Sequence, residues 1–140
     1  MRLKSIFLSG AVLLVSVVMM NCAGNLSVER MYAEPQPVSQ GEDLTLYVVI
    51  DGATDKVDRV VGTVREYTEM RTSFKNDGTN GDQTANDNVW TYQTPISWDT
   101  PTGTYHIDVS VYDQQGEEIV TEGFENRWTG KTGTIELTIE

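Results

Sequence analysis

Three segments of the chain alternate apolar and polar residues with a period of two. The apolar members are Leu44, Leu46, Val48 and Ile50 in the first segment, Tyr105, Ile107, Val109 and Val111 in the second, and Ile135, Leu137 and Ile139 in the third. Because successive side chains of a β-strand point to opposite faces, this spacing puts one apolar face on each segment. The pattern predicts three amphipathic strands that share one core.

Weaker patterns of the same kind lie between and before these segments. Short β-branched and aromatic runs predict further strands at 26–31, 57–64, around 72–75, at 89–96 and at 117–121. Clusters of Gly, Asn, Asp and Pro separate the runs, and Asp113 to Gly116 is typical of a hairpin loop closed by a glycine with positive φ. No stretch keeps a helical period. The sequence therefore predicts an all-β fold, an antiparallel β-sandwich of about seven strands.

The N-terminus has the pattern of a secretory signal. Arg2 and Lys4 precede an apolar run from Ile6 to Met20, and the first acidic residue is Glu29. The alternative is a membrane span, but the run is shorter than the roughly 20 residues that a bilayer requires and ends at Asn21. We therefore expect the protein to be exported.

Cys22 is the single cysteine and directly follows the apolar run. The tetrapeptide that ends in Cys22 resembles the lipobox of bacterial lipoproteins. It departs from that pattern at Met19, where a branched aliphatic residue is usual, and at Asn21, where a small residue is usual. The resemblance implies a lipoprotein signal peptide over 1–21, an acylated Cys22 with a short tether over 22–25, and one domain over 26–140. The alternative is an unmodified thiol beside an ordinary cleaved signal.

The resemblance to the lipobox also indicates a location. Ala23 is not the aspartate that marks retention in the inner membrane of enteric bacteria, so the outer membrane is favoured.

The formal net charge is -11, and loss of Arg2 and Lys4 with the leader makes it -11 - 2 = -13. Nucleic acid is excluded as a partner, because binding phosphates requires clustered Lys and Arg. Without a second cysteine, packing alone must hold the domain together.

Three stretches resemble the immunoglobulin-like domains of bacterial surface and exported proteins. They are a lead-in over 35–43, an Asp/Gly-rich loop over 76–90, and an approach to a strand over 99–107. The resemblance extends over about 38–113 and implies an immunoglobulin-like β-sandwich in the cell envelope. It implies no particular activity, because this scaffold carries many functions.

The resemblance also assigns roles to single residues. The hydroxyl of Tyr105 would bond back to the preceding corner, two residues before a buried Ile107. Tyr105 would otherwise be an ordinary core aromatic. Asn88 stands where the Asp/Gly-rich loop usually has its second glycine, and asparagine also enters the left-handed region.

The Asp/Gly-rich loop is the first candidate site. Its Asp and Asn side chains offer hard oxygen ligands within a short glycine-rich segment, which is what calcium prefers. The candidate calcium ligands are Asn76, Asp77, Asn80, Asp82 and Asp87. The alternative is that these side chains cap the backbone of their own turns.

A second candidate lies in an excursion between the last two expected strands. Phe124 and Trp128 are large apolar residues in a glycine-bounded loop, and Arg127 belongs to a residue type enriched in binding hot spots. Such a loop would bind a protein partner or a glycan. Alternatively, both rings fold back and close the end of the sandwich.

Catalysis has little support in the sequence. His106 is the only histidine and falls on the expected polar face of its strand, and Cys22 is assigned to lipid, so neither a catalytic triad nor a zinc site is apparent. We expect no enzyme but a binding or structural module on an envelope membrane, such as an accessory subunit of a surface assembly.

Two other functions stay open. A carbohydrate-binding module would use an exposed row of rings drawn from Trp128, Phe124, Tyr47 and Tyr112. An envelope hydrolase would require a cleft around His106 with paired carboxylates.

Overall fold

The structure is a computed structural model, and it describes residues 27–52, 54–119 and 133–140. These residues form seven β-strands and one short 3₁₀ turn, η1 (Thr54–Lys56), without an α-helix. The strands are β1 (Ser27–Glu34), β2 (Asp43–Asp51), β3 (Val57–Val64), β4 (Tyr67–Ser73), β5 (Val89–Pro95), β6 (Gly103–Asp113) and β7 (Gly133–Ile139). The all-β prediction is confirmed. In these residues no helix is long and apolar enough to cross a membrane.

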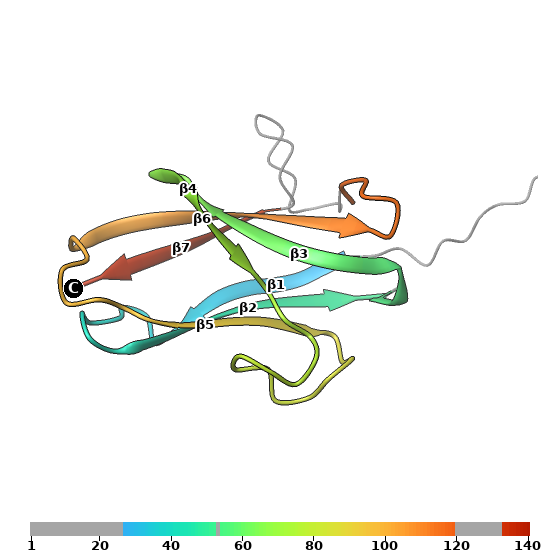
Figure 1. Cartoon of the computed structure of the whole chain (residues 1–140), viewed down its shortest axis with the longest axis horizontal. Coiled ribbons are helices and arrows are strands. Elements are labelled where there is room, and N and C mark those ends of the chain that lie inside the picture. Colours follow the sequence, from blue (N-terminus) through green and yellow to red (C-terminus); the bar gives the residue numbers. More distant parts are fainter. Residues whose placement is uncertain (1–26, 53, 120–132) are drawn as a thin grey trace, which may run out of the picture.

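The strands form two antiparallel sheets that lie face to face (Figure 1). One sheet has the order β1-β2-β5 and the other has the order β4-β3-β6-β7. The three strong alternating segments are β2, β6 and β7, and their apolar residues pack between the sheets. Val48, Val109 and Val111 are completely buried there. A β-sandwich with one shared core is therefore present, as the alternation predicted.

The outer face of β6 differs from the expectation. Asp108 and Ser110 alternate with the core residues of β6, yet both are buried. The reason is that β6 lies in the middle of its sheet, between β3 and β7, so side chains of those strands cover it. Arg65 binds Asp108 through two hydrogen bonds of 2.7 and 3.1 Å, and the hydroxyl of Thr134 donates a third of 2.7 Å.

The strand predicted around 72–75 begins earlier, and this difference shapes the sandwich. β4 runs from Tyr67 to Ser73 along β3. Just beyond it, Phe74 N–H still bonds to a carbonyl of β3, whereas Lys75 N–H donates to the carbonyl of Thr91 in β5. The chain therefore crosses from one sheet to the other at this point, and Figure 1 shows β4 running obliquely toward the β2–β5 layer.

Several local predictions can be compared with the structure. Gly116 has φ 83° in the hairpin loop, as expected. The backbone of Asn88 is not left-handed, which corrects the interpretation of the Asp/Gly-rich loop. The asparagines of this loop that do have left-handed backbones are Asn80 and Asn86, with φ of 54° and 58°. The strand expected at 117–121 is reduced, within the described residues, to a single bridge between Tyr112 and Glu118.

Candidate functional site

A cavity of about 440 Å³ lies between the two sheets. It arises because β4 pairs with β3 and not with β5, so the four-stranded sheet extends past its three-stranded partner on that side. The crossing at Phe74 and Lys75 closes this side at one end only. The cavity is thus a pocket of the sandwich itself, formed by the unequal widths of the sheets.

The cavity occupies one end of the sandwich. Its walls come from the first residues of β2 and β6 and the last residues of β3, β5 and β7. The apolar part of the wall includes Leu44, Leu46, Val64, Ile107, Leu137 and Ile139. Because Ser27 of β1 pairs with Asp51 at the end of β2, the chain enters the domain at the opposite end. The first residues of β1 are therefore far from the cavity along the strand direction.

Aromatic and sulfur-containing side chains surround the cavity on the side of β4. Tyr67 and Met70 line it and are 47% and 59% exposed, which is unusual for large apolar residues on a strand. The ring of Tyr67 stacks on that of Tyr105, with 6.1 Å between the ring centroids. The Tyr105 hydroxyl donates to the carbonyl of Pro101 at 2.6 Å, so the predicted bond to the corner is confirmed.

The electrostatics of the cavity are unusual for so acidic a chain. Its walls, as far as the chain is described, contain no charged side chain and no amide side chain. Burial raises the pKa of the Tyr105 hydroxyl, and the neighbouring Tyr67 and Glu66 raise it further. The cavity therefore disfavours negative charge.

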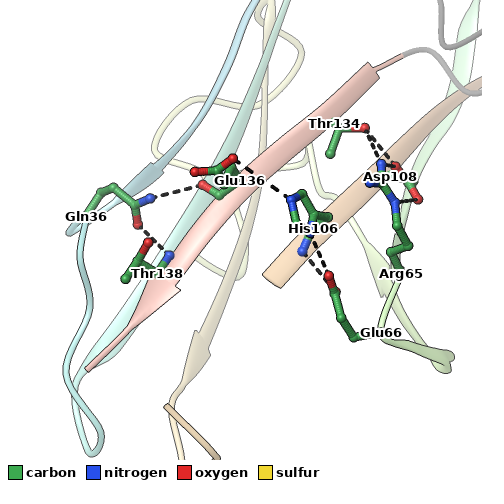
Figure 2. Close-up of polar contacts among 8 residues, drawn as sticks. All are labelled: Gln36, Arg65, Glu66, His106, Asp108, Thr134, Glu136 and Thr138. Atoms are coloured by element: carbon green, nitrogen blue, oxygen red, sulfur yellow. Dashed lines mark hydrogen bonds and ion pairs between the residues drawn. The ribbon is translucent and has the colours of Figure 1, made fainter. Parts of the chain in front are cut away.

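A polar cluster lies on the outer face of the four-stranded sheet, outside the cavity (Figure 2). His106 lies on this outer face, the polar face predicted for its strand, and its side chain is 32% exposed. Its Nδ1 lies 2.6 Å from Glu66 Oε1, its backbone N–H donates to Glu66 Oε2 at 3.0 Å, and its Nε2 lies 3.9 Å from Glu136. Partial desolvation would raise the pKa of Glu66, but the hydrogen bonds from His106 outweigh this effect and lower it.

This cluster ties the β3–β4 turn to β6 and β7. It does bring paired carboxylates to His106, as the hydrolase hypothesis required. However, His106 is not a wall residue of the cavity, and its ring is held against Glu66. The cluster acts as a structural tie in this arrangement.

The Asp and Asn side chains of the 76–88 loop bind the backbone of their own turns. The buried Asp82 carboxylate accepts from the N–H of Gly78 at 2.7 Å and of Thr84 at 3.4 Å. Asp87 accepts from the N–H of Val89, and Asp77 accepts from the N–H and hydroxyl of Thr79.

Asn76 and Asn80 complete the account of this loop. The side chain of Asn76 donates to the carbonyl of Asp87 and accepts from its N–H, and Asn80 supplies a left-handed turn residue. No group of three or more His, Cys, Asp or Glu suited to a metal ion occurs in the described ranges. The calcium site stays a prediction.

Some of the remaining candidate residues lie outside the part of the chain that the structure describes. Cys22 and the loop residues Phe124, Arg127 and Trp128 lie outside the described residues. Tyr47 stacks on Tyr32 on the three-stranded sheet, with 4.7 Å between centroids, whereas Tyr112 lies under the guanidinium of Arg59 on the other sheet. Since they belong to different sheets, the two tyrosines do not form the single row of rings that glycan stacking needs.

Sequence reasoning missed the cavity and its surroundings. Tyr67 and Met70 were not assigned to a strand, although the run from Tyr67 to Ser73 is rich in β-prone residues. Trp98, which is 78% exposed in the β5–β6 loop, was not singled out either.

Comparison with known proteins does not assign the chain to a family. No protein-family model matches the chain, and no curated protein matches it significantly. A Niemann-Pick type C2 protein from the Japanese carpenter ant is similar in structure, with a TM-score of 0.45, 8% identity, and coverage of 84% of this chain and 95% of that chain.

The DNA glycosylase AlkC of Pseudomonas fluorescens, bound to DNA containing an abasic site analog, gives a TM-score of 0.46 and 13% identity. That match covers 83% of this chain and 30% of the glycosylase chain. Similarities at this level carry no argument about the function of this chain.

Proposed function

We propose that this protein is a non-catalytic binding module of the cell envelope that holds a small apolar ligand between its two sheets. The observation that carries the proposal is the cavity of about 440 Å³ with its uncharged, mostly apolar wall. Ligand sites in proteins typically measure about 300–1,000 Å³ and are lined by hydrophobic and aromatic side chains. The cavity fits that description in both size and lining.

The energetics of the unliganded cavity support this proposal. Tyr67 and Met70 of its wall are 47% and 59% exposed, so the cavity opens to solvent and its apolar wall is hydrated. An apolar ligand that covers this wall gains about 25 cal/mol for each Å² of apolar surface removed from water.

The scaffold proposed is immunoglobulin-like. The first, second and fifth strands share one sheet, as strands A, B and E do in that fold, and the third, sixth and seventh follow the order C, F and G. The bond from Tyr105 to Pro101 has the geometry of the tyrosine corner at the start of strand F. The fourth strand departs from the constant-type order, since it joins β3 rather than β5, and this departure is what opens the cavity.

The location proposed is the surface of an envelope membrane, with Cys22 as the lipid anchor. β1 begins only five residues after Cys22, at the end of the sandwich away from the cavity. In this arrangement a ligand enters and leaves at the end of the domain farthest from the anchor.

A fluorescent probe tests the proposed function. The full chain carrying Cys22→Ser, which has no acyl group to compete, should bind the uncharged dye N-phenyl-1-naphthylamine saturably at one site. Thr94→Phe places a ring in the cavity wall and should weaken binding by about tenfold, equivalent to about 1.4 kcal/mol. Titration of dye fluorescence measures both affinities.

Gln93→Phe is the matched control, because Gln93 is the preceding residue of β5, is exposed, and is not a wall residue. Its affinity should equal that of the parent chain, and circular dichroism confirms that both variants fold. Saturable binding that Thr94→Phe leaves unchanged would place the site elsewhere, and no saturable binding at all would refute the proposal.

A further inference from the structure

We infer that the cavity selects a ligand with an uncharged polar end, such as a long-chain or ring alcohol, over an anionic lipid of the same size. This inference rests on the proposed function and names the chemical class of the ligand. Two observations support it: the polar atoms in the cavity wall, and the hydrogen bonds and ion pairs that polar groups in and near the wall already make.

Two hydroxyl groups of the wall, those of Tyr105 and Ser97, are already engaged as donors, whereas Thr72 Oγ1 is buried without a partner among the described residues. The Tyr105 hydroxyl donates to the carbonyl of Pro101, and the Ser97 hydroxyl binds the carboxylate of Asp99. A hydroxyl has one proton to donate and two lone pairs to accept with, so both oxygens keep only accepting capacity. A ligand hydroxyl, which both donates and accepts, can pair with these lone pairs and with Thr72 Oγ1, whereas a carboxylate or phosphate, which only accepts, can use the donor alone.

The charges near the cavity also favour a ligand with an uncharged end over an anionic one. The wall holds no Lys, Arg or His to pair with an anion. Arg65, two residues from the wall residue Tyr67, is bound to Asp108. Arg71, between the wall residues Met70 and Thr72, points to the opposite face of β4. Glu66 and Asp99 are acidic neighbours of wall residues. An anionic end would therefore lose water without gaining a counter-charge, which is costly.

A cationic end is disfavoured for a related reason. An ammonium group would donate to the free lone pairs, but it also requires a carboxylate once it is desolvated. Glu66 is held by His106 at 2.6 Å, Asp99 is bound to Ser97, and neither is a wall residue. The cavity therefore matches a hydroxyl group better than a charge of either sign.

A displacement experiment with three ligands of equal chain length tests this selectivity. Dodecan-1-ol, dodecanoate and dodecylammonium, each below its micelle concentration, compete with N-phenyl-1-naphthylamine for the full Cys22→Ser chain at pH 7. We expect the alcohol to displace the dye at a concentration at least about tenfold lower than either ion. Equal or tighter binding of dodecanoate or of dodecylammonium would overturn the inference.

The two proposals fail in different ways in this experiment. If the dye does not bind saturably, the proposed function fails before any competitor is added. If the dye binds and an ion competes as well as the alcohol, the cavity binds apolar ligands but does not select against charge.

A hydroxyl deletion gives a second readout. Tyr105→Phe keeps the ring in the wall but removes the accepting oxygen, so alcohol affinity should fall by about twofold to tenfold while dye affinity stays the same. Tyr112→Phe, on the same strand but away from the cavity, is the control and should change neither affinity. Parallel loss of dye and alcohol binding in Tyr105→Phe would mean that the residue only shapes the wall, and the hydroxyl argument would be wrong.

Discussion

Gly62 sets how closely three strands approach at the closed end of the cavity. A β-carbon placed on it would overlap the hydroxyl oxygen of Thr72, and it would lie 2.7 Å from Ile107 Cγ2 and 3.3 Å from Phe74 Cε2. These neighbours come from β4, from β6 and from the residue that follows β4. The absence of a side chain at this position therefore allows β4 to lie close over the core before the chain crosses to β5.

Gly62→Ala should destabilise the fold by about 1–3 kcal/mol, the usual cost of forcing an extra methyl group into a packed interior. Urea unfolding measures the loss. In a double-mutant cycle, Thr72→Ala removes the overlapping hydroxyl, so the double variant should be less destabilised than the sum of the two single variants. Strict additivity would mean that Thr72 is not the obstacle.

Single residues were predicted well where one local rule governs them. Tyr105 was assigned its bond to the preceding corner from sequence, and Gly116 its positive φ, because both depend on a few adjacent residues. Asp108 and Asn88 were misjudged. The burial of Asp108 depends on Arg65 and Thr134, which belong to other strands, and that pairing cannot be found from the period of β6 alone.

The 76–88 loop shows at the scale of an element how acidic side chains organise a turn. Asp82 is buried, and its carboxylate caps two backbone N–H groups on either side of it. Asp77 and Asp87 cap nearer neighbours. These bonds explain the composition of the loop through its own conformation.

Asp82→Ala should therefore cost about 1–3 kcal/mol, because it removes a buried carboxylate that accepts hydrogen bonds from two backbone N–H groups. We expect the loss to be the same with calcium, with equal magnesium and with neither, as thermal unfolding can measure. Asp77→Ala, at an exposed position, is the control and should cost less. A rise in melting temperature specific to calcium that disappears in Asp82→Ala would contradict the capping account and support a calcium site.

Strands were predictable in proportion to their burial on one face. β2, β6 and β7 have strict apolar alternation because one face of each contacts the core, and all three were found from sequence. β4 was placed too late, because most of its residues are exposed and the alternation is lost. Because β4 is exposed, its sequence lacks the alternation that would predict a strand. The same exposed strand places Tyr67 and Met70 beside the cavity.

At the scale of the whole molecule, the cavity follows from the topology. Three strands face four, and the unmatched strand is β4, so the sheets separate on that side. No periodicity in the sequence indicates which sheet an exposed strand will join, because that choice depends on pairing between residues far apart in the chain. The sandwich was therefore predictable, whereas the site in it was not.

The central claim is that the space between the sheets is the ligand site, and methyl-labelled NMR tests it most directly. With N-phenyl-1-naphthylamine bound to the full Cys22→Ser chain, intermolecular NOEs should connect the dye to the methyl groups of Leu44, Val64 and Leu137 in the cavity wall. Methyl groups of Val57 and Val111, which belong to the core but not to the wall, should give none. NOEs to methyl groups outside the wall, without any to Leu44, Val64 or Leu137, would contradict the account.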